Sequence, residues 1–320
     1  MLPRSPLRLT LAITAGALAL SSCATFTNTS EVAEVEGAAV SDEEFASLSR
    51  SYFETDLFFQ QSSLGQTAEE RIDNGSVDAD ATRGLLTAVI LQELLTGFLA
   101  DQDVDNSAIR TEFETGTLPQ TPLAGVDIDP ALIDLIIDGD PTVTSQSLGL
   151  VDVPDTERLE ELYTSDPTST GVVCVRHILV ETEDEADDII DDLAAGDDFA
   201  ELATERSQDE ASAVNGGAIT APDNECIPLD TVRQGFDPAF AAGIIGGAES
   251  AVVGPVDTSF GWHVILTRPW TEVAESVGAL MQPGAAGGFL FDGYRATADI
   301  DVDARYGRWN RLLEAVEPIG

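Results

Sequence analysis

Two histidines constrain the fold of this chain more than any other feature. They are the only histidines in the sequence, and each lies inside a short apolar run. Period-two alternation places each imidazole on the apolar face of a predicted β-strand. The two faces are Val173, Val175, His177 and Leu179 in the first run, and His263, Ile265 and Thr267 in the second. Because a buried imidazole without a hydrogen-bond partner is costly, we expect the two histidines to bond each other.

Short motifs surround these histidines in a definite order. From Gly171 to Trp270 the chain contains HILV (177–180), G-x-x-F-x-x-L-A (196–203), S-x-D (207–209), a Gly-Gly pair (216–217), P-x-F (238–240) and T-x-F-G-x-H (258–263). This series resembles the parvulin family of peptidyl-prolyl cis–trans isomerases. The resemblance implies that residues 171–270 form an α/β roll with helices flanking a four-stranded sheet. It also implies an enzyme without a cofactor, because rotation about an Xaa-Pro bond breaks no covalent bond.

The same resemblance assigns roles to six side chains. Rotation about the bond crosses a barrier of about 20 kcal/mol set by amide resonance, so a catalyst must bind the twisted amide better than the planar one. An apolar pocket for the proline ring and a small polar cluster meet that need. By motif position these are Phe236 and Phe240 for the ring, Asp209 facing the amide, and His177, Thr258 and His263 as a polar floor.

Each assignment has a structural alternative. The histidines could serve only to link two strands, and Asp209 could serve only to cap a helix that begins at Glu210. Phe240 could belong to the core, whereas Phe236 stands at a loop end. The Gly-Gly pair predicts a tight turn with positive φ. The loop from Ala221 to Gln234 is long for this family and borders the expected substrate groove.

The N-terminus has the composition of an export signal. Residues 1–22 contain two arginines, an apolar run too short to span a membrane stably, and then small residues. The signal ends Leu-Ser-Ser-Cys, which resembles the bacterial lipobox with Cys23 as the lipidated first residue. Residues 23–31 would form a tether. We therefore expect an extracytoplasmic bacterial lipoprotein held to a membrane by acyl chains; the alternative is an ordinary signal peptide followed by an incidental cysteine.

The remaining cysteines form an even pair. An exported protein matures in an oxidising compartment, so we expect Cys174 and Cys226 to form a disulfide that holds the long loop to the core. Two free buried thiols are the alternative. CxxC spacing is absent, and the sequence predicts no metal site.

The charge balance excludes one class of partner. The chain carries 58 acidic residues against 15 basic ones, a net charge of −43, and every basic residue is an arginine. Such a field repels nucleic acid and disfavours acidic client proteins. Some parvulins bind phosphorylated substrates through a basic cluster after the first strand, but Glu181–Glu185 occupies that position here. Recognition of phosphate is therefore not expected.

The region of residues 32–165 predicts a mainly helical lobe. Helices are expected from a capping box at Ser41–Glu44 to about Phe53, and over Asp80–Asp101, Asn106–Glu114, Asp129–Ile137 and Thr156–Tyr163. Gln92 and Glu93 make the longest of these a core helix rather than a membrane span. The arrangement resembles the N-terminal chaperone lobe of SurA- and PrsA-type foldases, where clefts hold unfolded chains; a mere spacer is the alternative.

The last segment, residues 271–320, is expected to return to that lobe. Met281–Gly288 is rich in Gly and Ala and predicts a loop, whereas Ala298–Val302 alternates like an edge strand. Tyr306, Trp309 and Leu312 would anchor the end of the chain.

We therefore expect an α+β protein with a helical chaperone lobe, completed by the C-terminal segment, and one parvulin domain. Its expected activity is proline isomerisation in unfolded or folding exported polypeptides. The alternative is a holdase chaperone whose parvulin domain binds chains with little turnover.

Overall fold

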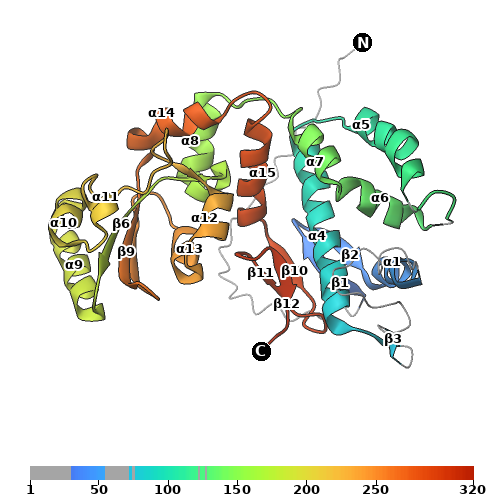
Figure 1. The fold of residues 1–320 in the computed structure, drawn as a ribbon, viewed down its shortest axis with the longest axis horizontal. Coiled ribbons are helices and arrows are strands. Elements are labelled where there is room, and N and C mark those ends of the chain that lie inside the picture. The colour runs from blue at the N-terminus through green and yellow to red at the C-terminus, as the bar shows by residue number, and fades with distance from the viewer. Residues whose placement is uncertain (1–29, 55–71, 74–75, 122, 127) are drawn as a thin grey trace, which may run out of the picture.

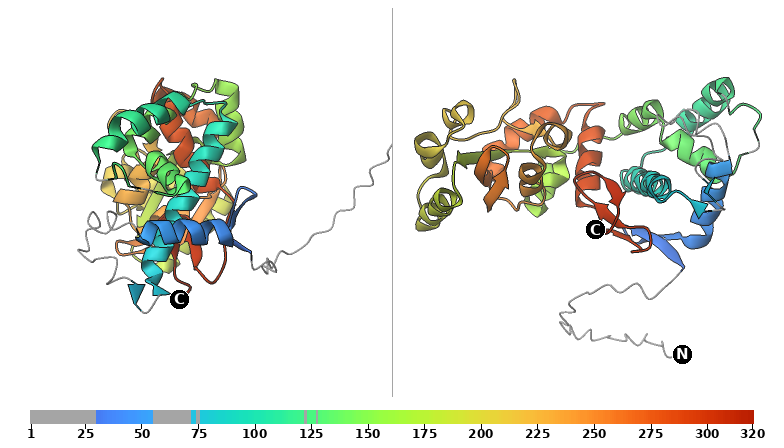
Figure 2. Two further views of the ribbon diagram at one scale, coloured as in Figure 1. Left: turned by 90° about the vertical axis from the view of Figure 1, so that its right-hand side faces the viewer. Right: turned by 60° about the horizontal axis from the view of Figure 1, so that its bottom comes forward.

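The computed structural model describes residues 30–54, 72–73, 76–121, 123–126 and 128–320. The predicted signal peptide, Cys23 and nearly all of the predicted tether lie outside the described residues. Within them, helices combine with short antiparallel sheets in two bodies that flank one central helix (Figures 1 and 2). This agrees with the predicted α+β class.

The first body, here called the N-terminal lobe, is mainly helical. Its elements are β1 (Glu31–Val35), β2 (Ala38–Ser41), α1 (Asp42–Glu54), β3 (Ile72–Asp73), β4 (Ser76–Val77), α4 (Ala79–Asp101), α5 (Ser107–Glu112), two short turns of helix (Phe113–Thr117 and Leu118–Gln120), α6 (Pro130–Asp138) and α7 (Pro141–Leu148). Asp129 and Asp140 accept backbone N–H groups at the starts of α6 and α7, and a proline follows each of them. This local Asp-Pro signal sets both helix starts, because proline suits the first helical position.

Helix α4 is the core of the lobe. It is long and apolar enough to cross a membrane by length and composition, but Leu86, Ile90 and Leu94 are completely buried inside the protein. They pack with residues of β1, α1, α6 and the C-terminal strands in one apolar cluster. The structure therefore agrees with the predicted core helix.

The C-terminal strands pair with the beginning of the described chain. β10 (Ile300–Val302) pairs antiparallel with β1, so that Ala33 lies opposite Val302, and β2 flanks β1 on the other side. β11 (Arg308–Asn310) and β12 (Ala315–Glu317) form a hairpin next to it. Tyr306 and Trp309 pack on the lobe core, whereas Leu312 packs on the core of the second body. The end of the chain thus contacts both bodies.

The second body, here called the histidine half, is built on the sheet β6-β9-β8. These strands are β6 (Val175–Val180), β9 (Gly261–Thr267) and β8 (Val252–Thr258), all antiparallel. Around them lie α8 (Thr156–Ser165), a short helical turn (Pro167–Thr170), α9 (Glu183–Ala195), α10 (Phe199–Arg206), α11 (Glu210–Ala213), α12 (Leu229–Gly235), α13 (Pro238–Ile244) and α14 (Trp270–Leu280).

The two faces of this sheet carry different helices. Ile178 and Val264 pack with residues of α9 and α10 on one face. Val175 and Ile265 pack with residues of α12 and α13 on the other. Because side chains alternate along a strand, both histidines share the α12–α13 face. The predicted faces of the two strands, each carrying its histidine, are therefore confirmed.

The predicted four-stranded sheet is wrong in its strand count. The main sheet has three strands, and β5 (Val172–Val173) pairs with β7 (Ile227–Pro228) as a separate ribbon. The segment after the Gly-Gly turn makes only an isolated bridge, between Ala218 and Arg176. Hydrogen bonds from the His177 N–H to the Gly217 carbonyl and from the Ile219 N–H to the Val175 carbonyl flank this bridge. The pairing ends there because the chain then passes into the loop that leads to β7.

The central helix α15 (Ala286–Thr297) was not predicted. The sequence suggested a loop over Met281–Gly288, but the helix begins inside that range. Glycine lowers helix propensity, yet here it permits close packing. A Cβ on Gly293 would lie 2.1 Å from the carbonyl oxygen of Ser169, and one on Gly171 only 1.6 Å from that of Phe289. α15 thus packs backbone to backbone on the linker between the bodies.

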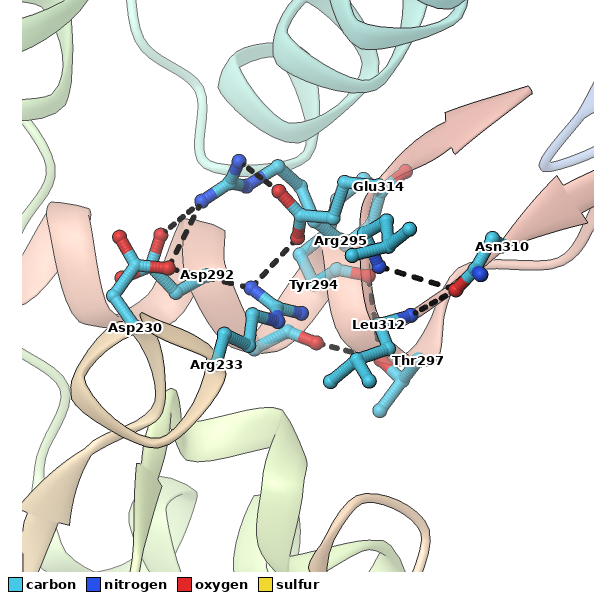
Figure 3. Close-up of polar contacts among 11 residues, drawn as sticks. Asp230, Arg233, Asp292, Tyr294, Arg295, Thr297, Asn310, Leu312 and Glu314 are labelled. Carbon is cyan, nitrogen blue, oxygen red and sulfur yellow. Dashed lines mark hydrogen bonds and ion pairs between the residues drawn. The ribbon is translucent and has the colours of Figure 1, made fainter. Parts of the chain in front are cut away.

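A cluster of charged side chains, here called the central ion cluster, lies beside α15. It comprises Asp230 and Arg233 of α12, Asp292 and Arg295 of α15, and Glu314 in the β11–β12 turn (Figure 3). Arg233 Nη1 lies 2.7 Å from Glu314 Oε1 and 3.4 Å from Asp230 Oδ1. Arg295 contacts both Glu314 and Asp292. The cluster joins the histidine half to the C-terminal segment.

Candidate functional site

A groove of about 420 Å³ opens on the histidine face of the sheet. Five of the six predicted site residues line it: His177, Asp209, Phe236, Phe240 and His263. The sixth, Thr258, lies directly behind His263. Residues from β6, α11, α12, α13 and the β8–β9 hairpin therefore meet in one place, although they are spread over more than eighty positions of the chain.

The polar side of the groove is one continuous hydrogen-bond chain, here called the groove cluster. His177 Nδ1 lies 3.2 Å from His263 Nδ1, so the predicted pairing of the histidines is confirmed. On one side His177 Nε2 lies 2.8 Å from Asp209 Oδ2, and on the other His263 Nε2 lies 3.0 Å from Thr258 Oγ1. The chain runs from Asp209 through both rings to Thr258.

Asp209 is both a helix cap and a member of the cluster. Its Oδ1 accepts the backbone N–H of Ala211 at 3.2 Å, which starts α11. Its Oδ2 accepts the Ser212 hydroxyl at 2.6 Å and faces His177. The capping bond fixes the carboxylate so that its second oxygen points at the imidazole, and the two interpretations of Asp209 are therefore compatible. The sequence did not single out Ser212, because a serine in the first turn of a helix gives no local sign of a contact with His177 on a distant strand.

The electrostatics favour neutral rings beside an ionised carboxylate. Burial, together with the neighbouring His177, lowers the pKa of His263 to about 4. Burial also lowers the pKa of His177, although Asp209 opposes this. Burial raises the pKa of Asp209, but hydrogen bonds from Ser212 and His177 outweigh it and the pKa is lowered overall. At neutral pH, His177 Nε2–H can donate to Asp209, His263 Nδ1–H to His177, and Thr258 Oγ1–H to His263.

The apolar side of the groove is formed by two stacked phenylalanines. The ring centroids of Phe236 and Phe240 are 5.7 Å apart with planes 14° from parallel. Phe240 is buried, and the centroid of its ring lies 4.8 Å from that of His263 in a T-shaped arrangement, so Phe240 belongs both to the core and to the groove wall. Phe236 is only partly buried, at the end of α12. Apolar rings and polar cluster thus face one cavity.

The tip of the β8–β9 hairpin adds residues that the sequence did not single out. Asp237 caps α13 through the backbone N–H of Ala239 at 2.9 Å. Its other oxygen accepts the hydroxyl and the backbone N–H of Ser259, at 3.3 and 3.5 Å. This bond holds the hairpin tip over the groove, where Phe260 forms part of the lining while 74% of its surface remains exposed. The F-D-P and T-S-F patterns give no local hint of this contact.

The Gly-Gly turn supports the first histidine strand. Gly216 and Gly217 both have positive φ, as the sequence predicts. The carbonyl of Gly217 accepts the backbone N–H of His177 at 2.8 Å. A Cβ on Gly217 would lie 2.4 Å from the carbonyl oxygen of His177, so no side chain fits there.

Cys174 and Cys226 form a disulfide with an S–S distance of 2.01 Å. It connects the residue before β6 to the residue before β7. The predicted long loop Ala221–Gln234 is shorter than expected, because β7 and α12 occupy its second half, and the disulfide holds the end of the remaining loop 221–226. Stable buried disulfides are typical of exported proteins. Among the described residues, no group of three or more His, Cys, Asp or Glu side chains is placed to hold a metal ion.

Comparison with known proteins identifies the class of this domain. Residues 177–268 match the family model of the rotamase PPIC-type PPIase domain. This part of the chain is a parvulin-type peptidyl-prolyl isomerase domain, in agreement with the motif order.

The individual relatives are foldases and parvulins. The chain is 40% identical to the foldase protein PrsA of Clostridium kluyveri over 103 residues. This aligned region covers 32% of this chain and 27% of that protein. Over 91 residues it is 44% identical to a parvulin-like PPIase of Rickettsia bellii, 28% of this chain and 30% of that one. The matched region thus spans less than a third of these relatives.

Solved structures give a wider but weaker likeness. The crystal structure of PrsA from Bacillus subtilis is 17% identical, with 86% of this chain and 96% of that one covered and a TM-score of 0.29. A TM-score of that size does not establish a shared overall fold.

Proposed function

We propose that this protein is a peptidyl-prolyl cis–trans isomerase that assists the folding of exported polypeptides. The observation that carries the proposal is the groove itself, in which stacked Phe236 and Phe240 face the Asp209–His177–His263 chain across one cavity. An apolar wall suits a proline ring, and a fixed polar wall suits the amide beside it. The rotamase family match over the same residues supports the assignment.

The mechanism is non-covalent. The planar amide carries partial charges on its oxygen and nitrogen that disappear as the bond twists. An ionised Asp209 beside the carbonyl oxygen interacts less unfavourably with the twisted amide, because that oxygen has lost part of its negative charge. His177 and Ser212 hold the carboxylate in place, and His263, itself bonded to Thr258, holds His177. The phenylalanine pair would hold the proline ring while the rest of the substrate rotates.

We further propose that the mature protein is a lipoprotein anchored through Cys23 on the outer side of a membrane. The lipobox-like end of the signal and the disulfide support export. Its partners would be unfolded or folding exported chains with Xaa-Pro bonds. The extreme negative charge of −43 argues against nucleic acid as a partner.

A second candidate function is that of a holdase chaperone. A cavity of about 330 Å³ between the N-terminal lobe and α15 favours it, because about half of its lining residues are apolar. They include Ala88, Leu91, Leu95, Leu135 and Phe291. Such a cavity could hold an apolar side chain of an unfolded client.

One experiment separates the two functions. Isomerisation of short Xaa-Pro peptides is measured with the chain lacking residues 1–23, and with its Asp209→Ala and His263→Ala variants. Acceleration that is lost on altering Asp209 supports the isomerase. No acceleration, combined with suppressed aggregation of an unfolded client, would support the holdase and refute catalysis.

A further inference from the structure

A second cavity adjoins the isomerase groove. It has a volume of about 680 Å³ and shares Asn215, Ala218 and Thr220 with the lining of the first. Since the same residues form a wall of both cavities, a polypeptide with its proline in the groove can continue over this shared wall. We call the second cavity the side trough.

The side trough is built by the long loop and by α14. Pro222, Asn224 and Glu225 line it from the loop, and Glu275 and Ala279 from the helix.

Hydrogen bonds hold these two walls together. Asn224 Nδ2 donates to the carbonyl of Ser276 at 2.9 Å, and Asn224 Oδ1 accepts the backbone N–H of Cys226 at 2.7 Å. The disulfide to Cys174 secures the end of the loop to the strand that leads into β6. The trough is thus a preformed feature rather than a gap beside a loose loop.

The charges of the side trough are unequal. Its two arginines already have acidic partners, because Arg268 Nη2 lies 2.9 Å from Glu225 Oε2 and Arg176 Nη2 lies 3.7 Å from Glu272 Oε2. Arg176 also donates to the backbone carbonyls of Asn215 and Gly216, at 3.1 and 3.0 Å. The charges of both arginines are therefore already paired within the walls of the side trough.

Two carboxylates of the lining remain available. Within the described residues, Asp223 and Glu275 form no ion pair, and both side chains are exposed to the trough or to solvent. The lining thus offers unpaired negative charge and no unpaired positive charge. A cationic side chain is the complement that this arrangement favours.

We propose that the side trough is a second substrate subsite, which takes the segment flanking the proline of a client chain and favours an Arg or Lys side chain there. The inference rests on the proposed isomerase function and adds a substrate preference to it. The disulfide-bound loop then has a role beyond stability, since it supplies one wall of the subsite.

The test compares short and long peptides. An Ala-Pro tetrapeptide fits the groove alone, whereas longer peptides with a single Arg, Gln or Glu at successive flanking positions reach the trough. Isomerisation is measured by NMR exchange without a coupling protease, using the chain lacking residues 1–23. We expect kcat/KM to be about fivefold higher for Arg than for Glu at one flanking position, an effect that weakens at high salt.

Two variants with equal charge change decide the cause. In Asp223→Asn/Glu275→Gln the preference for Arg should disappear while turnover of the tetrapeptide stays unchanged. In Asp187→Asn/Asp191→Asn, on the exposed side of α9, the preference should persist. A preference that survives the first variant, or falls equally in both, overturns the proposal.

Failure of catalysis is distinguished from failure of the subsite by a binding measurement. Fluorescence anisotropy with the labelled Arg, Gln and Glu peptides reports affinity whether or not the bond is turned over. In one outcome the tetrapeptide is not isomerised while the Arg peptide still binds more tightly than the Glu peptide, with the difference lost in Asp223→Asn/Glu275→Gln. That outcome supports the subsite and refutes the isomerase assignment. Equal affinities for the three peptides overturn the subsite.

Discussion

The groove cluster and the central ion cluster are both polar networks beside α12, yet they differ in how they are enclosed. In the groove cluster the side chain of Asp209 is 31% exposed, whereas in the central ion cluster that of Glu314 is 13% exposed. Burial raises the pKa of Glu314 in spite of two arginine neighbours, while hydrogen bonds lower that of Asp209 in spite of burial.

This difference in exposure suits the two carboxylates to different roles, one in activity and one in stability. A carboxylate at an open groove can meet a substrate amide, so its charge remains available. A carboxylate enclosed between two bodies can meet only its own arginines, and it contributes to how the bodies are joined. Alterations of the groove cluster should therefore change activity more than stability, and alterations of the central ion cluster should do the reverse.

The largest expected effect is on stability, from Arg295→Met. This change leaves Glu314 and Asp292 enclosed with fewer cationic partners, and removing one member of a buried ion pair costs about 3–5 kcal/mol. Urea unfolding measures the loss. Arg308→Met, an exposed arginine on β11, is the matched control and should change little. Equal stability of the two variants would contradict a structural role for the cluster.

The next effect is on activity, from Asp209→Asn. Asparagine still caps α11, so stability should stay within about 0.5 kcal/mol, while loss of the charge lowers kcat/KM about 100-fold. Asp257→Asn, at an exposed position of β8, removes the same charge without touching the groove. The comparison fails if Asp209→Asn unfolds the protein or if both variants lose activity alike.

The pH dependence of stability should differ between the clusters. The pKa of His263 is about 4 in the folded protein and about 6.5 unfolded, so the unfolded chain binds more protons as pH falls through this window and stability declines. The raised pKa of Glu314 has the opposite effect on stability. The folded protein binds the proton more tightly there, so this contribution to stability is lost as pH rises through the folded pKa. His263→Gln should therefore flatten the acid side of the stability curve, as urea titrations from pH 4.5 to 7.5 would show. An unchanged slope would exclude a buried neutral His263.

The smallest effect is expected from Phe260→Ala at the hairpin tip. Its exposed ring borders the groove and can cover a substrate residue next to proline, so truncation should raise KM about fivefold with kcat nearly unchanged. Val252→Ala, another exposed apolar residue on β8, serves as the control. A drop in kcat alone would mean that the tip acts on the polar cluster instead.

Much of the site could be predicted because its signals are local. Alternation along each strand placed His177 and His263 on one face, and the motif order placed Asp209, Phe236 and Phe240 near them. The even cysteine count indicated the disulfide, whereas the start of α7 at Asp140-Pro141 was overlooked although its signal is local. Ser212 and Asp237 were missed because each looks locally like an ordinary turn or cap, and their second contacts come from distant segments.

The sequence by itself determined most of the segments that form strands and helices, and which of their faces are apolar, because those patterns depend on neighbours a few residues apart. Only the tertiary structure decided that a glycine-rich segment becomes the central helix. It also decided that the main sheet has three strands, and that a turn near the C-terminus meets α12 in an ion cluster. Such features depend on contacts between residues far apart in the chain. They are stabilised by the close packing of Gly293 on the linker and by the ion pair of Arg295 with Glu314, and neither contact can be recognised from a local sequence pattern.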